Sequence, residues 1–175
     1  RTTRDTDGDG QIDQIELTFS EAVDDSTMEI DDFALSNSYV IAGFTSGTVN
    51  DDTLFLTVTE SGAADTDAVP TVTYTQDAAT DLADISGNAL ANTGALSSND
   101  GAKPAVSIDE AVGQSDPTNT SPILFDVVFS EAVTGFETGD VSFSGTAGGT
   151  LAGTVSGGDT TYTVSVSGMS SDGTV

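Results

Sequence analysis

The chain has 175 residues, a length that suits one large domain or two small ones. It carries 29 acidic residues against 3 basic ones, which gives a formal net charge of −26. This charge excludes nucleic acid and anionic membrane surfaces as partners, because almost nothing in the chain neutralises phosphate groups. No apolar run is long enough to span a bilayer, so we also expect no membrane insertion.

The first feature along the chain is a loop rich in aspartate, residues 5–16. It matches the twelve-residue calcium pattern D-x-[DN]-x-[DN]-G-x5-E from end to end, with Gly10 where the backbone must turn. Carboxylates at every second position converge on one centre, as a hard cation such as Ca²⁺ requires. The expected ligands are Asp5, Asp7, Asp9, the backbone carbonyl of Gln11, and Asp13. The simpler alternative is a solvated turn.

The residues after this loop predict a strand and not the helix of a helix–loop–helix calcium site. Ile15, Leu17 and Phe19 alternate with polar residues, which is the period of a half-buried strand. On a strand, Glu16 would lie about 10 Å beyond Asp13 and point to the opposite face. We therefore leave Glu16 out of the expected ligand set.

The rest of the first half predicts short strands joined by turns. The expected strands are 33–36, 39–44, 53–59 and 69–75, and a loop from 77 to 91 leads to a last short strand. If the strands run alternately up and down, loop 60–70 lies at the same end as the calcium loop. Asp65 and Asp67 are then candidates for further ligands, although we favour the simpler interpretation that they are solvated acids.

The second half repeats the first. Residues 19–23, Phe-Ser-Glu-Ala-Val, recur unchanged as residues 129–133, 110 positions later. Small polar residues at 92–103 predict a linker between the copies, flexible as a free chain. The expected domains are 1–98, which contains the calcium loop, and 105–175, joined by a linker at 99–104. Strands are expected in the second domain at 106–108, 123–129, 141–143, 149–155 and 161–166.

Residues 5–23, together with 80–90 and its closing Gly87-Asn88, resemble the immunoglobulin-like repeats of bacterial surface proteins. Residues 104–164 resemble a sister class of these repeats. The resemblance implies an all-β chain of two tandem Ig-like β-sandwich domains. Only residues 1–4 precede the calcium loop, and the second copy stops at 175 without a closing segment, so each domain is expected to lack about one terminal strand. Truncation and donation of a strand by a neighbouring molecule both explain this.

The expected function is a non-enzymatic structural or adhesive module, extracellular or on the cell surface, which calcium stiffens. With no cysteine to form disulfides, a small extracellular domain needs another source of stability, and bound metal supplies one. The expected partners are calcium and neighbouring repeats or subunits of the same protein. The alternatives are a filament subunit assembled by strand donation, and a module that binds a ligand or carbohydrate.

Overall fold

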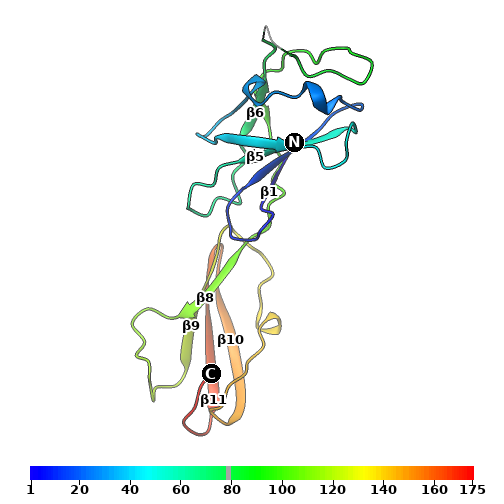
Figure 1. Cartoon of the computed structure of the whole chain (residues 1–175). Coiled ribbons are helices and arrows are strands. Elements are labelled where there is room, and N and C mark those ends of the chain that lie inside the picture. Colours follow the sequence, from blue (N-terminus) through cyan, green and yellow to red (C-terminus); the bar gives the residue numbers. More distant parts are fainter. Residues whose placement is uncertain (78–79) are drawn as a thin grey trace. The chain divides into compact units, whose positions relative to one another are not determined.

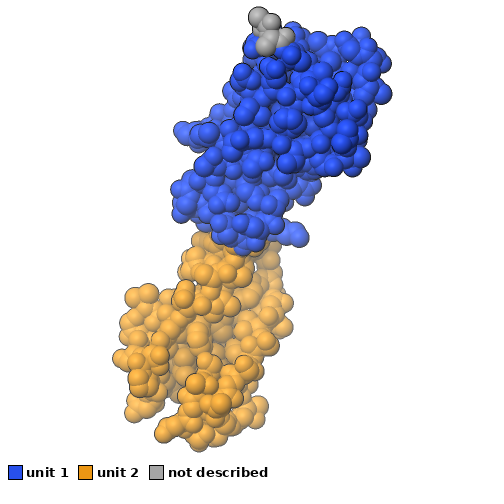
Figure 2. Space-filling model, viewed as in Figure 1, with its two compact units in different colours: residues 1–103 blue, residues 104–175 orange. Residues whose placement is uncertain are grey.

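The computed structural model describes residues 1–77 and 80–175, and the expected loop at 77–91 includes two residues outside this part. The chain divides into two compact units, Arg1–Lys103 and Pro104–Val175 (Figure 2). Both are built from antiparallel strands, which confirms the all-β prediction (Figure 1). Among the described residues no helix is long and apolar enough to cross a membrane. The helices there are three 3-10 turns, η1 (Asp25–Thr27), η2 (Ile30–Asp32) and η3 (Thr138–Asp140).

Unit 1 is a β-sandwich of two sheets. The first has the order β1-β2-β5-β4 and the second the order β3-β6-β7. The strands of the first sheet are β1 (Thr2–Arg4), β2 (Gln14–Thr18), β5 (Thr53–Val58) and β4 (Ile41–Thr45). Those of the second are β3 (Phe33–Leu35), β6 (Thr71–Tyr74) and β7 (Leu96–Ser97). The expectation that the first domain lacks a strand before the calcium loop was wrong: Thr2–Arg4 form β1, which pairs antiparallel with β2.

The core of unit 1 is formed by the side chains at every second position of its strands, as the alternating pattern on β5 shows. On β5, Leu54, Leu56 and Val58 are buried, while the residues between them are half-buried. From the other sheet, Tyr74 packs against Phe33 with ring centroids 5.1 Å apart. Burial of one face of each sheet holds the sandwich together, because each buried large side chain contributes about 1.5 to 3 kcal/mol.

The segment expected to be a flexible linker belongs to unit 1. Its residues form β7, and Asn99 then pairs with the N-terminal strand: the Thr3 amide donates to the Asn99 carbonyl at 3.0 Å. The Gly101 amide donates to the Thr3 hydroxyl at 3.1 Å, and Ala102 is buried in the core. The loop expected at 77–91 is followed by the short strand β7, and in its described part Ala83 and Ala89 make an isolated bridge.

Unit 2 has one four-stranded sheet, of order β8-β9-β11-β10. Its strands are β8 (Val106–Glu110), β9 (Ile123–Phe129), β11 (Thr161–Met169) and β10 (Gly149–Gly158). One face carries Val127, Val164 and Val166, all buried. Phe129, Phe136 and Tyr162 pack edge to face beside them, with centroids 5.2 to 5.8 Å apart.

The internal repeat in the sequence is also a repeat in hydrogen bonding. After β2, the amides of Phe19 and Val23 donate to the carbonyls of Asp52 and Asp51. After β9, the amides at the two equivalent positions of the repeated motif donate to the carbonyls of Thr160 and Asp159. The order β1-β2-β5-β4 in unit 1 thus corresponds to β8-β9-β11-β10 in unit 2.

The prediction of a strand at 141–143 was wrong, because these residues are not in a strand. The equivalent segment of unit 1 is β3, which follows η2 as residues 141–143 follow η3. β3 is a strand because it pairs with β6. No strand of the described unit 2 takes the place of β6, so residues 141–143 have no neighbouring strand to pair with.

Candidate metal centre

The candidate site is the loop that joins β1 to β2. Its backbone folds around the first aspartate: one carboxylate oxygen of Asp5 accepts from the Gly8 amide at 2.7 Å, and the other accepts from the Gly10 amide at 2.9 Å. Both glycines have positive φ, 80° and 93°, which side chains with a Cβ resist. The aspartate and glycine spacing thereby fixes the shape of the loop.

The loop brings its carboxylates together. Single oxygens of Asp5, Asp7 and Asp13 lie within 4.8 Å of one another, as do oxygens of Asp7, Asp9 and Glu60. Two oxygens bound to one calcium ion at about 2.4 Å lie at most about 4.8 Å apart. Both groups therefore have the spacing that a single ion requires, and Asp7 is common to the two.

Asp13 has the clearest unfilled bonding capacity in the loop. Its Oδ2 accepts from the amide of Thr6 at 3.2 Å and from the Thr6 hydroxyl. Its Oδ1 is buried and has no hydrogen-bond partner within the described ranges 1–77 and 80–175. A buried carboxylate oxygen without a donor is costly, and a bound cation removes that cost. The residues present therefore fit a calcium ion.

Gln11 connects this loop to loop 60–70. Its amide and its Nε2 donate to the two carboxylate oxygens of Asp9 at 2.9 and 2.8 Å. Its side-chain oxygen accepts from the Gly62 amide. The backbone carbonyl of Gln11 as a ligand stays a prediction.

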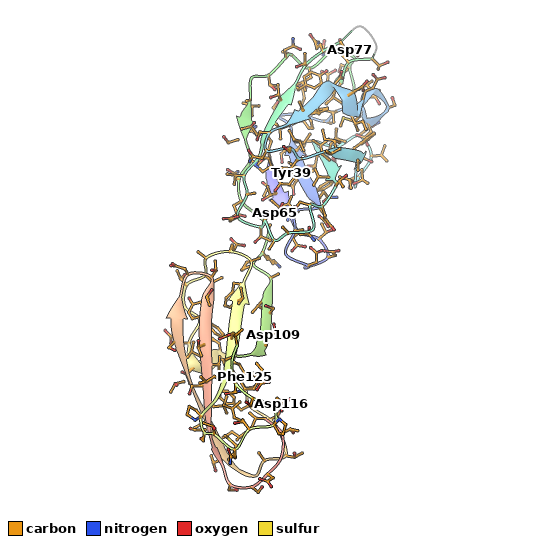
Figure 3. The ribbon with its side chains drawn as sticks, turned by 90° about the vertical axis from the view of Figure 1, so that its left-hand side faces the viewer. Tyr39, Asp65, Asp77, Asp109, Asp116 and Phe125 are labelled. Carbon is orange, nitrogen blue, oxygen red and sulfur yellow. The ribbon has the colours of Figure 1, made fainter. Side chains whose placement is uncertain are left out.

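Asp65 is not the solvated acid that we favoured from the sequence. Its Oδ1 accepts from the amide of Ile12 at 2.7 Å, and its Oδ2 accepts from the Tyr39 hydroxyl at 2.5 Å (Figure 3). Its own amide donates to the Gly10 carbonyl at 3.0 Å. Burial and the hydrogen bond to Asp65 raise the pKa of Tyr39. Asp65 therefore connects the aspartate loop, through Ile12, with Tyr39, which lies just before β4. Asp67 is exposed.

Glu60 was missed in the sequence analysis. It directly follows the strand 53–59, and the antiparallel pairing of Gln14 with Thr57 places it beside the aspartate loop. The charge of Asp9, followed by desolvation and the charge of Asp7, raises the pKa of Glu60. The sequence carries only part of the signal: Glu60 follows an expected strand, but the pairing of that strand with β2 comes from the fold.

Glu16 has a different role from metal binding. Its carboxylate accepts from Nε of Arg4 at 2.8 Å and also pairs with the Arg4 terminal nitrogen. Arg4 lies on β1 opposite Gln14, so this ion pair crosses between β1 and β2. Glu16 is in neither group of converging carboxylates around the loop.

Unit 2 carries a different feature, an apolar groove of about 370 Å³ on its sheet. One wall is the sheet, with Val127, Val164 and Val166, and Phe125 lies in this groove on β9 (Figure 3). The other wall is the segment that contains Phe143. The groove lies where the second sheet covers the core in unit 1.

The fold and the loop together define a class of all-β protein with an acidic loop suited to a hard cation. Comparison with protein-family models, with curated proteins and with solved structures found no match to this chain.

Proposed function

We propose that the chain is a pair of tandem Ig-like modules from an extracellular or cell-surface protein, with a structural and non-enzymatic role, and that calcium bound in the aspartate loop stabilises the first module. The observation that carries this proposal is the convergence of Asp5, Asp7 and Asp13, with a buried oxygen of Asp13 that has no donor. Such an arrangement stores repulsion between like charges, which a divalent cation converts into attraction.

The mechanism is a cross-link between segments that are distant in the sequence. The loop ends at β2 in the first sheet, and Asp65 holds it to Tyr39 near β4 and to loop 60–70. An ion shared by Asp7, Asp9 and Glu60 would add a second connection between the same two loops. Calcium therefore favours the folded sandwich and not only the loop.

The expected affinity is that of extracellular calcium modules, with Kd of about 0.1 to 1 mM. At 10 mM calcium such a site stabilises the folded unit by about 1.4 to 2.7 kcal/mol. The tandem arrangement supports a role as a stalk or arm, since repeated modules extend a chain without adding catalytic groups.

Isothermal titration calorimetry with calcium tests this proposal. The loop variant is Asp7→Ala with Asp9→Ala, which removes both side chains as ligands, since the calcium pattern tolerates Asn at these two positions. The matched control is Glu21→Ala with Asp52→Ala, two exposed acids of unit 1 outside the converging groups. We expect the loop variant to bind one calcium fewer than the control. Equal binding by the two variants would refute the proposed site.

The groove in unit 2 favours a second candidate function, a filament subunit that accepts a strand from a neighbouring copy. The edge strand β8 is exposed along its length, with Val106 54% and Ile108 62% exposed. An unpaired edge beside an apolar groove is the usual acceptor for an added strand.

Sedimentation velocity over a range of protein concentrations tests this second function. A subunit of this kind forms assemblies whose size grows with protein concentration. The substitution Phe143→Asp, in the wall of the groove, should disrupt these assemblies. A monomer at every concentration would exclude self-assembly through the groove.

A further inference from the structure

A second group of acidic residues lies elsewhere in unit 1, around the pairing of β3 with β6. Phe33 at the start of β3 pairs with Tyr74 at the end of β6. The Thr75 amide also donates to the carbonyl of Asp32 at 2.9 Å. The acids that precede β3 therefore lie beside those that follow β6. Figure 3 shows Asp77 at the end of unit 1 opposite Asp65.

Three of these carboxylates have the spacing of cation ligands. Oxygens of Glu29, Asp31 and Asp77 all lie within 4.8 Å of one another. Glu29 is half-buried, whereas the other two are exposed. Exposed acids alone would carry no conclusion, since they separate readily in water.

The independent observation is Asp32, which is only 3% exposed. Neither of its carboxylate oxygens has a hydrogen-bond partner among the residues that the structure describes. A buried carboxylate without a donor or a counter-charge is among the costliest arrangements in a folded protein. Native structures that contain one usually provide a metal ion, a water or a basic side chain as its partner.

The chain itself supplies no positive charge here. Burial raises the pKa of Asp32, and the neighbouring charges, all of them acidic, raise it further: Asp77, Asp81, Asp31 and Glu29. The sequence has only three basic residues, and the ion pair among the described residues is between Arg4 and Glu16. A bound cation would supply the compensating charge that the chain does not.

We propose that Glu29, Asp31 and Asp77 bind a second divalent cation, and that the buried carboxylate of Asp32 anchors it to the core. Asp81 supports this arrangement by accepting from the Asp77 amide at 3.2 Å. Ligands that are all carboxylates select a hard ion such as Ca²⁺, and the sequence offers no histidine or cysteine to favour zinc. This site is independent of the aspartate loop.

The test uses the loop variant, Asp7→Ala with Asp9→Ala, so that only the second site remains. Equilibrium dialysis with radioactive calcium should give two ions per wild-type chain and one per loop variant. Adding Asp32→Asn or Asp77→Asn should lower the remaining affinity at least tenfold, while adding Asp109→Asn in unit 2, an exposed acid, should leave it unchanged.

Asp77 is exposed, so Asp77→Asn tests the site even if the change at buried Asp32 prevents folding, which circular dichroism would reveal. A folded loop variant that binds no calcium would overturn the proposal. The proposal would also be overturned if the loop variant bound its remaining calcium ion with the same affinity whether or not it carried Asp77→Asn. One wild-type ion that only Asp77→Asn removes would support this site and refute the loop site, so the two proposals fail separately.

Discussion

Replacement of Asp65 by alanine should destabilise unit 1 more than any other change in loop 60–70. The change removes the acceptor of two hydrogen bonds, from the Ile12 amide and the Tyr39 hydroxyl. Ile12 is fully buried, so its amide would be left without a partner. Hydrogen bonds to charged groups contribute about 1.5 to 3 kcal/mol each, and partial exposure of Tyr39 lowers its share. We expect a loss of about 2 to 4 kcal/mol.

Urea unfolding followed by circular dichroism, in excess chelator, measures this loss without any contribution from calcium. Asp65→Asn should cost about half as much, because its amide oxygen still accepts from Ile12. Asp67→Ala is the matched control: it removes the same charge two residues away from an exposed position, and should change stability by less than about 0.5 kcal/mol. Equal losses for Asp65→Ala and Asp67→Ala would show that the connection through Asp65 does not exist.

Three further predictions concern backbone and pH. Gly10→Ala should lower the free energy of unfolding in chelator by about 1 to 2 kcal/mol, because φ at this position is 93°. It should also weaken calcium binding, which calorimetry measures. Gly101→Ala should speed amide exchange of β1, because the added Cβ would overlap the Thr2 side chain; unchanged exchange would contradict the observed packing. Burial raises the pKa of Tyr39 and of Tyr74. The folded state therefore keeps these protons above pH 10, where the unfolded chain releases them, and unfolding free energy should fall as pH rises beyond 10. Tyr39→Phe should make that fall shallower.

The positions of β5 and β6 in unit 1 could be predicted because buried and half-buried residues alternate regularly along both strands. Leu54, Leu56 and Val58 share one buried face, and the turns between strands carry Gly, Asn and Asp. β7 could not be predicted in the same way. Its Leu96 and Ser97 are both exposed, and the strand exists because it pairs with β6. Such a strand has no signal in its own composition.

The strand expected at 141–143 shows the opposite failure. Val141 and Phe143 have the right alternation, but alternation predicts only which face would be buried. A strand also needs a neighbour for its backbone hydrogen bonds, and the described unit 2 offers none there. The same tertiary requirement explains why β3, in the equivalent place, does form a strand.

The residues of the candidate metal centre also fall into two groups, those that local sequence spacing predicts and those that only the fold brings together. The ligands within 5–13 could be expected because their spacing is local and follows a known loop geometry. Glu60, Asp65 and the second group around Asp32 depend on which strands are neighbours, and only the fold supplies that information.

The central claim is that calcium in the aspartate loop stabilises unit 1. Thermal unfolding of wild type, the loop variant and the Glu21→Ala/Asp52→Ala control, each in 10 mM calcium and in chelator, tests it most directly. The loop site alone should raise Tm by roughly 5 to 20 °C in wild type and control. The calcium-induced rise should be smaller in the loop variant by that amount. A loop variant that gains as much from calcium as the control does would contradict the claim.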